Sequence, residues 1–258
     1  MKQNELYHQL IEKNHLEHFI YLPKKLNFEV CKKYDIDIIN CGFGTSMFNI
    51  AYGLTDHVQF DVLIDNMKKI FKYQPFAWWV PQSQCSEKFT DTLLSDKSFS
   101  METTEYSMIC DLSNPLSLQR STSLTIEMVT NQSLLNDFIS VLEPYDLNVP
   151  GFYKRMTDEA FSSSEKLYVG FEAGRPVTIG ILYTNGDRAG VFSLITSEAS
   201  RGKGYGTDMM IYLLNFAKTN QFRFVTLSAS SDAGYRIYER LGFVQIGQFE
   251  CYEYAGEQ

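Results

Sequence analysis

Residues 198–210, EASRGKGYGTDMM, constrain the fold of this 258-residue chain more than any other stretch. The stretch contains two cations and three alternating glycines: Arg201, Lys203, Gly202, Gly204 and Gly206. Glycine relieves the steric limits that a Cβ atom sets on the backbone. An apolar run typical of an amphipathic helix begins at Met209. The stretch therefore predicts a flexible basic loop that leads directly into a helix.

A loop of this kind suits an anion. The first N–H groups of a helix have no partner within the helix, and the positive end of the helix dipole attracts negative charge. Without Cβ atoms in the way, an anion can reach the backbone, and Arg201 and Lys203 add positive charge. Residues 201–207 are therefore predicted to hold a phosphate group. The alternative is a surface hairpin that happens to contain glycines.

Other phosphate-binding and hydrolase motifs do not fit. The third glycine comes one residue too early for the G-x-G-x-x-G pattern of dinucleotide-binding folds, and the sequence lacks G-x-x-x-x-G-K-[ST]. It also lacks the G-x-S-x-G turn of serine hydrolases. The pattern that remains is R-x-x-G-x-G at residues 201–206.

The composition limits the classes of partner. Hydrophobic residues make up 44% of the chain and charged residues 21%, which is enough to form a core. The net charge of -8 argues against nucleic-acid binding and is compatible with a cationic substrate. No apolar run approaches the roughly 18 residues of a membrane span, so no membrane partner is expected and a reducing cytoplasm is the default location.

Cysteine and histidine spacing does not indicate a metal site. The five cysteines show no C-x-x-C pair, which argues against both a zinc site and a disulfide framework. His15 and His18 share one face of a predicted helix and could bind a metal, but a polar helix surface explains them equally well. No metal is therefore predicted, and the sequence gives no prediction of the oligomeric state.

The second half of the chain follows a serine-rich seam at residues 112–123. Residues 124–129 are predicted to form a strand, and Ser133 to cap a helix. Turns at Ala173-Gly174 and Asn185-Gly186 divide residues 166–196 into three strands. The other expected elements are a short helix near 151–161, a helix from the glycine loop to Thr219, a strand at 222–227, a helix at 233–241 and a strand pair that turns near Gly247.

The first half repeats the end of this order. A helix near residues 4–19 and a strand-rich stretch come first, followed by a strand at 48–53, a helix at 58–72, a strand at 76–80, a helix at 86–95 and a strand from Phe99. Phe48 and Phe192 are 144 positions apart, and so are Phe99 and Phe243. This offset predicts a degenerate duplication with domains 1–115 and 116–258. The alternative is that two α+β halves share an order by chance.

The second half resembles the GNAT superfamily of N-acetyltransferases. The resemblance covers residues 122–254 and rests on two motifs, R-x-x-G-x-G at 201–206 and YERLGF at 238–243, which looks like the family's Y-x-x-x-G-F ending. The motifs lie in the expected order with one strand between them. The resemblance implies an α+β fold with a mixed sheet, in which a GNAT domain follows a degenerate GNAT-like first half.

The resemblance also implies acetyl-coenzyme A as the cofactor, held in a gap between the fourth and fifth strands. The pantetheine arm would run along the fourth strand, and the pyrophosphate would lie on the N–H groups of residues 201–207. The family often has an asparagine where this chain has Ser231. The expected cofactor-binding residues are Leu194, Ile195, Thr196, Arg201, Gly202, Lys203, Gly204, Tyr205, Gly206, Thr207 and Ser231.

The implied reaction is direct attack of an amine on the thioester, without a covalent enzyme intermediate. The backbone N–H of Leu194 would stabilise the developing oxyanion. Tyr238 would give the leaving thiolate a proton, and simple packing is its alternative role. The general base stays open between water and four carboxylates, those of Glu127, Glu172, Asp187 and Glu198.

The first half lacks R-x-x-G-x-G, and Leu94 stands where Tyr238 would be, so it is expected to bind no coenzyme A. Trp78 and Trp79 point to opposite faces of a strand, and one of them is expected in the core. Two functions are compatible with the whole chain. The first is an N-acetyltransferase that acts on a small-molecule or peptide amine, and the second is a non-catalytic module that binds or senses acyl-CoA.

Overall fold

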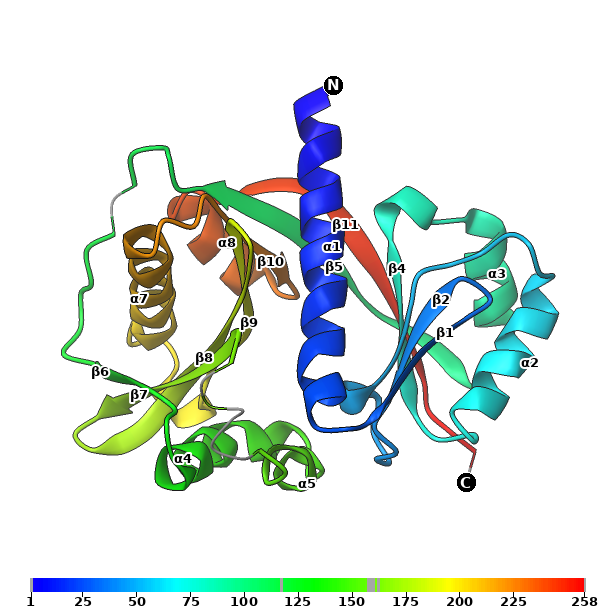
Figure 1. The fold of residues 1–258 in the computed structure, drawn as a ribbon, viewed down its shortest axis with the longest axis horizontal. Coiled ribbons are helices and arrows are strands. Elements are labelled where there is room, and N and C mark those ends of the chain that lie inside the picture. Colours follow the sequence, from blue (N-terminus) through cyan, green and yellow to red (C-terminus); the bar gives the residue numbers. More distant parts are fainter. Residues whose placement is uncertain (1, 117, 157–160, 162, 258) are drawn as a thin grey trace. The chain divides into compact units, whose positions relative to one another are not determined.

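The computed structural model describes residues 2–116, 118–156, 161 and 163–257, which form two compact units (Figure 1). Unit 1 contains Met1–His18 and Ser107–Ile246, and unit 2 contains Phe19–Tyr106 and Gly247–Gln258. Each unit therefore takes residues from both halves of the sequence. The division into repeats at 1–115 and 116–258 stays a prediction, because the units are defined by contacts and the repeats by sequence pattern.

A mixed sheet forms the centre of unit 1. Its strands are the end of β5 (Phe99–Asp111, from Ser107 on), β6 (Thr125–Met128), β7 (Glu165–Glu172), β8 (Arg175–Asn185), β9 (Arg188–Thr196) and β10 (Phe224–Ala229). Strands β6 to β9 form an antiparallel meander, β10 runs parallel to β9, and the end of β5 lies beside β10. Ala173, Gly174 and Gly186 have positive φ values of 48°, 76° and 60°. These values suit tight hairpin turns, and both predicted turns are confirmed.

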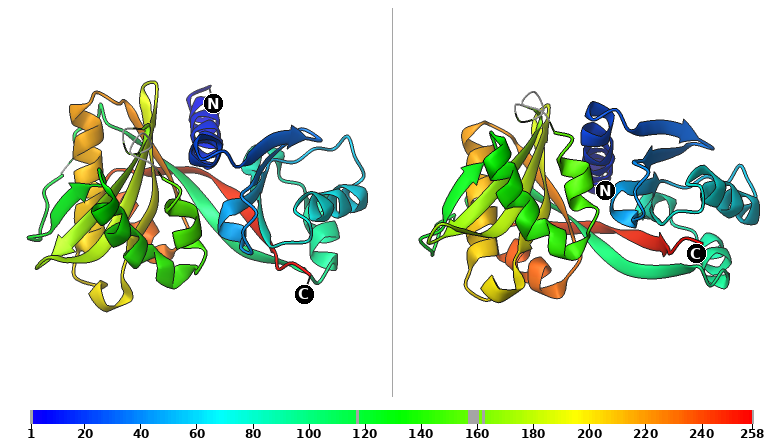
Figure 2. Two further views of the ribbon diagram at one scale, coloured as in Figure 1. Left: turned by 60° about the horizontal axis from the view of Figure 1, so that its bottom comes forward. Right: turned by 90° about the horizontal axis from the view of Figure 1, so that it is seen from below.

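The helices of unit 1 lie on both faces of this sheet, with α7 on one face and α4 and α5 on the other (Figure 2). They are α1 (Lys2–Lys25, up to His18), α4 (Gln132–Leu142), η3 (Glu143–Tyr145), α5 (Val149–Tyr153), η4 (Glu198–Ser200), α7 (Tyr205–Thr219) and α8 (Asp232–Arg240). None of the helices in the described part of the chain is both long and apolar enough to cross a membrane.

Three sequence predictions for unit 1 need correction or limits. Asn131, not Ser133, caps α4, and its side chain accepts the N–H of Leu134 at 3.0 Å. Asparagine and serine are nearly equal as caps, so the sequence could not choose between two positions this close. The helix expected near 151–161 is described only as α5, because residues 157–160 lie outside the described residues. The first helix extends beyond its expected bounds of 4–19.

The strand pair predicted around Gly247 is wrong. Residues 244–254 form one continuous strand, β11 (Val244–Tyr254). The common two-residue hairpin turns need a residue with positive φ, and Gly247 is not among the described residues that have one. Glycine within a strand marks a close approach or a bend as readily as a turn, and the sequence alone does not separate these uses.

Unit 2 repeats the plan of unit 1. Its elements are β1 (Glu29–Lys33), β2 (Ile36–Asn40), η1 (Ser46–Phe48), β3 (Asn49–Tyr52), α2 (Phe60–Ile70), β4 (Phe76–Pro81), η2 (Gln82–Gln84) and α3 (Glu87–Ser95). Strands β1 to β3 form an antiparallel meander, β4 runs parallel to β3, and β11 pairs antiparallel with β4 from Phe249 to Tyr254. The shared order supports the predicted duplication.

The last strand of each repeat completes the sheet of the other unit. In unit 2 the neighbour of β4 is β11, which comes from the second half of the sequence. In unit 1 the neighbour of β10 is the end of β5, which comes from the first half. Unit 2 therefore depends on a strand that is distant in sequence from the rest of that unit, whereas the end of β5 in unit 1 leads directly into the seam and β6.

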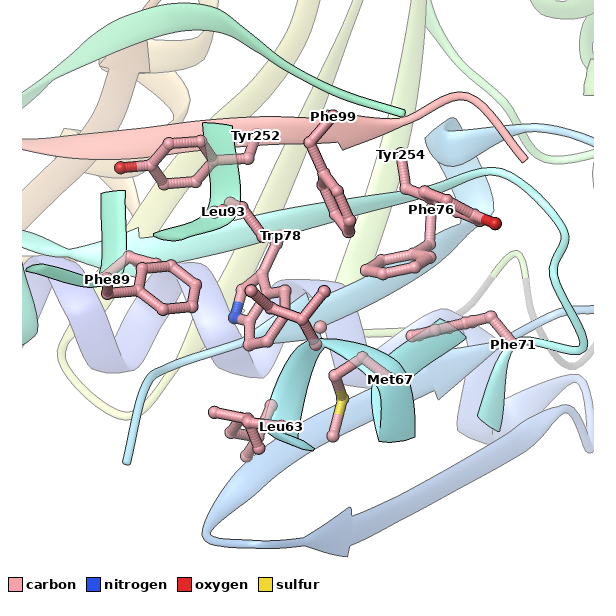
Figure 3. Close-up of a cluster of buried hydrophobic side chains, with 14 of the residues drawn as sticks. Leu63, Met67, Phe71, Phe76, Trp78, Phe89, Leu93, Phe99, Tyr252 and Tyr254 are labelled. Atoms are coloured by element: carbon pink, nitrogen blue, oxygen red, sulfur yellow. The ribbon is translucent and has the colours of Figure 1, made fainter. Parts of the chain in front are cut away.

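The core of unit 2 is built around Trp78 and a layer of aromatic rings (Figure 3). Trp78 is fully buried, and its Nε1 donates to the carbonyl of Gly53 at 2.9 Å. Trp79 points to the other face, where it is partly buried and packs edge-on against Phe19 and Phe249. The prediction that one tryptophan of the pair lies in the core is confirmed, and that residue is Trp78.

Replacing Trp78 by Phe should destabilise unit 2, because the change leaves a cavity and an unpaired buried carbonyl. We expect the free energy of unfolding to fall by about 2 kcal/mol, measured by urea denaturation with circular dichroism. Trp79→Phe is the matched control and should cost less, since Trp79 is partly exposed. An equal or larger loss in the control would contradict the assignment of Trp78 as the core residue.

Candidate functional site

The parallel ladder between β9 and β10 stops early. Its pairs are Phe224–Arg188, Val225–Ala189 and Thr226–Gly190. Strand β9 continues to Thr196 and β10 to Ala229, and within these fully described strands no later residues pair with each other. We call the two unpaired ends, residues 191–196 and 227–229, the split.

A β-bulge redirects the end of β9. On β8, Ile179 pairs with Ile195 and Ile181 pairs with Phe192, so β9 carries one extra residue between these positions. Ser193 has a positive φ of 46° at this point. Leu194 consequently has no partner in the register between β8 and β9, both of which are described throughout. Bulges of this kind often lie beside active sites, where they change the direction of a strand.

The first helix covers the last rung of the ladder. Asn14 Nδ2 donates to Thr226 Oγ1 at 2.7 Å. A Cβ atom at Gly190 would come within 2.5 Å of Asn14 Nδ2 and 2.6 Å of the Phe192 ring, so only glycine fits here. The split therefore begins where α1 meets the sheet, a contribution of the first helix that the sequence did not predict.

The glycine loop has the backbone geometry of an anion cradle. Gly204 is the N-cap of α7, and its φ of 86° is a left-handed conformation that favours glycine. Among the described residues, no protein atom accepts the backbone N–H groups of residues 202–207. The predicted loop and helix are confirmed, and this run of free donors is what the anion cradle requires. The bound phosphate stays a prediction.

Protein groups hold the two cations of the loop. Arg201 donates from Nη2 to Tyr145 Oη at 2.7 Å and from Nε to the carbonyl of Thr196 at 3.3 Å. Lys203 Nζ lies 3.8 Å from Glu172 Oε2. These contacts tie the loop to the end of β9 and to η3, and Glu172 offsets part of the positive charge.

Glu172 also receives a hydrogen bond from the first residue of α7. The Tyr205 hydroxyl donates to Glu172 Oε1, and this bond raises the pKa of the phenol. Tyr205 is buried, whereas Gly206 and Thr207 are partly exposed. In the first turn of α7, Tyr205 is thus held by Glu172, while Gly206 and Thr207 stay accessible.

The seam at residues 112–123 docks onto α7 through Asp208. Its carboxylate is fully buried and accepts the backbone N–H of Ser121 at 2.9 Å, the N–H of Thr122 at 2.7 Å and the Thr122 hydroxyl at 2.6 Å. Arg120 Nε lies 3.9 Å from the same carboxylate. Burial alone raises the pKa of Asp208, but the hydrogen bonds from Thr122 and Ser121 outweigh it and lower the pKa below its usual value.

The sequence reasoning missed Asp208. The sequence analysis gave Asp208 no role, although a carboxylate in the first turn of a helix is favoured by the helix dipole. The available signal was an aspartate within an apolar run, followed at once by Met209 and Met210. Its partners lie 86 and 87 positions away, so the sequence did not identify them.

Tyr238 and Ser231 lie in the segment that follows β10. Ser231 is the N-cap of α8, and its Oγ accepts the N–H of Gly234 at 3.2 Å. The Tyr238 ring is partly buried, with its centroid 6.0 Å from that of Phe243. A Cβ atom at Gly234 would lie 3.5 Å from the Tyr238 hydroxyl, which places the phenol toward the first turn of α8.

The glycine loop and α8 therefore share one end of the sheet. The loop follows the carboxyl end of β9, and the first turn of α8 follows the carboxyl end of the parallel strand β10. Ligands of open α/β sheets bind outside the carboxyl ends of parallel strands, where neighbouring strands separate. The split, the free N–H groups and the Tyr238 phenol thus form a candidate site at one place in unit 1.

The two histidines of α1 do not lie on a polar surface, and that interpretation was wrong. His15 is 3% exposed, and its Nε2 lies 3.3 Å from Ser228 Oγ. His18 stacks on Phe192 at 3.6 Å, and its Nδ1 lies 3.3 Å from Glu165 Oε2. The signal for burial was the helical spacing of Ile11, His15, His18 and Leu22. Within the described residues, no group of three or more potential ligands could hold a metal.

Residues 132–243 match the sequence profile of the Acetyltransferase (GNAT) family. None of the curated protein sequences is significantly similar to the chain. A GCN5-related N-acetyltransferase from Kribbella flavida is similar in structure, with a TM-score of 0.69 and 12% identity over 96% of this chain and 95% of that one. A conserved protein of unknown function from Staphylococcus epidermidis is similar too, with a TM-score of 0.69 and 15% identity over 93% and 98%.

A third solved structure bears on the duplication. A tandem GNAT protein from the clavulanic acid biosynthesis pathway matches with a TM-score of 0.54 and 12% identity, over 86% of this chain and 79% of that one. The match to the GNAT acetyltransferase family covers residues 132–243, and the solved structures share the fold of the chain, including the tandem plan expected from the sequence.

Replacing Asp208 by Asn should loosen the seam from α7, because an amide nitrogen cannot accept the N–H groups that the carboxylate accepts. We expect a loss of about 2 kcal/mol in the free energy of unfolding at pH 7. The folded-state pKa lies below the unfolded value of about 3.9, so the carboxylate's contribution is present above pH 4 and is lost as the pH falls through the folded pKa.

Urea denaturation between pH 3 and pH 7 tests this expectation, and the exposed Asp187→Asn serves as the control. The difference between the wild type and Asp208→Asn should shrink at the acidic end, while Asp187→Asn should stay close to the wild type throughout. A difference that stays constant from pH 7 to pH 3 would contradict the role given to the ionised carboxylate.

Proposed function

We propose that this protein is an N-acetyltransferase that transfers the acetyl group of acetyl-CoA to a primary amine of a small molecule or a peptide. The observation that carries the proposal is the run of backbone N–H groups at residues 202–207, which have no acceptor among the described residues and lie beside the split, in a stretch that matches the GNAT family. The five cysteines are free thiols, which supports a reducing, cytoplasmic location. The net charge of -8 favours a cationic amine.

The loop fits the diphosphate of coenzyme A. Within the part of the chain that the structure describes, its donors have no protein acceptor, and Gly202 and Gly204 present no side chain to an approaching phosphate. The end of β9 does not pair with β10 at Leu194, Ile195 and Thr196. The backbone groups on that edge of β9 are therefore open to the pantetheine amides. The residues proposed to hold acetyl-CoA are Leu194, Ile195, Thr196, Arg201, Gly202, Lys203, Gly204, Tyr205, Gly206, Thr207 and Ser231.

Three of these residues, Arg201, Lys203 and Ser231, already make contacts within the protein, and those contacts leave them able to bind the cofactor. Arg201 and Lys203 keep their charge near the loop while they are anchored to Tyr145 and Glu172. Ser231 Oγ accepts the N–H of Gly234, and its hydroxyl proton is still available to donate. Ser231 can therefore supply a hydrogen-bond donor at the position where the family often has an asparagine.

When bound, acetyl-CoA supplies a thioester carbonyl that an amine can attack. The Leu194 N–H is the proposed donor to the carbonyl oxygen as negative charge develops, since the bulge leaves Leu194 out of register with β8. The Tyr238 phenol is the proposed proton donor for the departing sulfur. Both groups belong to the end of the sheet where the strands separate.

Thr207→Glu should weaken acetyl-CoA binding without destabilising the protein. Thr207 lies in the first turn of α7, where a carboxylate favours the helix but repels a phosphate. We expect the dissociation constant measured by isothermal titration calorimetry to rise about tenfold, which corresponds to about 1.4 kcal/mol. Thr207 is preferable to Gly204, because any side chain at Gly204 would also strain the backbone.

Thr207→Gln is the matched control, since glutamine has nearly the same shape as glutamate but carries no charge. It should bind acetyl-CoA within about threefold of the wild type, a difference of less than about 0.7 kcal/mol. If Glu and Gln weaken binding equally, the diphosphate does not lie at this turn. If the wild-type protein shows no binding at high micromolar acetyl-CoA, the proposed function fails altogether.

Tyr238→Phe keeps the ring and removes the hydroxyl. If the phenol protonates the leaving sulfur, kcat should fall about 10²–10⁴-fold while the affinity for acetyl-CoA is unchanged. Release of free thiol against a panel of amines measures kcat, and Tyr235→Phe in the same helix is the control. Full activity in Tyr238→Phe would assign the tyrosine to packing. Tight binding without turnover of any amine would favour the non-catalytic acyl-CoA-binding module.

A further inference from the structure

The first helix packs on the face of unit 1 that carries alternate residues of β10. Tyr7 contacts Phe224 edge-on at 5.7 Å, and Asn14 donates to Thr226. One rung further, His15 Nε2 lies 3.3 Å from Ser228 Oγ. The contacts follow β10 from its start to the split, so α1 is aligned along the strand as a structural part of unit 1.

Ser228 lies in the split itself. It is two residues beyond Thr226, the last residue of β10 that pairs with β9. Ser228 is partly exposed, whereas His15 behind it is 3% exposed. A ligand in the split can therefore reach the serine hydroxyl, and the hydroxyl separates that ligand from the imidazole.

Ring contacts hold the imidazole of His15 in place. The Phe192 ring lies 5.4 Å from His15 and stacks on His18 at 3.6 Å, with the two planes 10° apart. Phe192 belongs to β9 at the start of the split. An aromatic side chain from the strand that borders the split therefore packs against both histidines of α1.

The surroundings keep His15 neutral at physiological pH. Burial lowers the pKa of the His15 imidazole well below its usual value, and the nearby His18 lowers it further. His18 in turn lies beside Glu165 of β7 and Tyr183 of β8. Burial and then the Glu165 carboxylate raise the pKa of Tyr153 of α5, so that phenol stays neutral. A neutral imidazole can accept a proton and release it again quickly.

Within the proposed acetyl transfer, on which this step rests, we infer that Ser228 and His15 form the proton relay that deprotonates the attacking amine. The Ser228 hydroxyl accepts the proton of the amine nitrogen and passes its own proton to His15 Nε2. The first helix of the chain thereby supplies the general base that the sequence left open.

The step is balanced in atoms and electrons. The amine nitrogen forms a C–N bond to the acetyl carbon while the C–S bond of the thioester breaks, and the sulfur leaves with the bonding pair. One N–H proton moves through Ser228 to His15 and then to solvent. The sulfur takes the phenol proton of Tyr238, which solvent replaces, so the products are the amide and free coenzyme A.

The carboxylates considered from the sequence are less suited to this role. Glu127, Asp187 and Glu198 are exposed, so they are fully solvated. Glu172 accepts from Tyr205 and lies near Lys203, which commits it to the glycine loop. The His15–Ser228 pair differs from all four, because it reaches the split from a buried position.

His15→Gln tests the relay, because glutamine keeps a hydrogen bond to Ser228 but is not a base. We expect kcat at pH 7 to fall about 10²–10⁴-fold, with the affinity for acetyl-CoA and the melting temperature close to the wild type. The deficit should shrink as the pH rises, because hydroxide replaces the lost base. Ser228→Ala should show the same loss and Ser228→Thr should recover the rate, because threonine keeps the hydroxyl. His57→Gln, whose side chain is 79% exposed in the wild type, is the control.

A second readout requires neither turnover nor bound acetyl-CoA. In ¹H–¹⁵N spectra of the histidine side chains, His15 should take up its proton only well below the pH at which an ordinary imidazole does, and Ser228→Ala should shift its Nε2 signal but not that of His57. If His15 titrates near 6.5 like a free imidazole, or Ser228→Ala leaves its signal unchanged, the relay is overturned.

The kinetic outcomes separate the two proposals. Wild-type turnover with an unchanged rate in His15→Gln at every pH overturns the relay and leaves the acetyltransferase intact. A loss of rate that is independent of pH and accompanied by a lower melting temperature assigns His15 to helix docking and also overturns the relay. Failure of the wild type to bind acetyl-CoA removes the proposed function, and the relay with it.

Discussion

Two neighbouring parallel strands of unit 1 pair over only three rungs, and the features of the site depend on where that pairing ends. Beyond Gly190 and Thr226, β9 and β10 keep one edge free of ladder bonds, and the bulge at Ser193 turns the end of β9 out of register with β8 as well. Asn14 donates to Thr226 of the last pair, so the first helix covers one face of the sheet where the split begins. Backbone that would otherwise pair within the sheet becomes available to a ligand.

At the start of α7, a buried carboxylate and a run of backbone N–H groups lie close together but have different partners. Asp208 directs its carboxylate to the seam, where Ser121 and Thr122 satisfy it. The N–H groups of residues 202–207 have no protein acceptor among the residues that the structure describes. A negative charge near a helix start usually competes with an anion for the same donors. Here the seam satisfies that charge from donors of its own, and the loop keeps its donors for the proposed diphosphate.

The sequence predicted features that depend on neighbouring residues and missed those that depend on distant ones. The glycine loop, the turns at Ala173-Gly174 and Asn185-Gly186 and the order of the elements follow local backbone preferences, and the structure has them. The docking of the seam on Asp208 and of α1 on Ser228 joins residues 86 to 213 positions apart, and no local pattern encodes such pairs. The predicted turn at Gly247 failed for a related reason, because a strand shared between units has no local signature. The roles of Tyr238, Leu194 and the loop in catalysis and binding stay predictions.

The exchange of the last strands has a consequence for how the chain is made. Unit 1 draws on residues from Met1 to Ile246, and unit 2 is completed by Gly247–Gln258. The sheet of unit 2 cannot close before β11 has been synthesised, although β1 to β4 are made much earlier. The first helix likewise waits through the synthesis of some two hundred residues for β10, the strand that it contacts. The two units of this duplicated fold are therefore expected to fold together, unlike tandem domains that mature one after the other as they emerge.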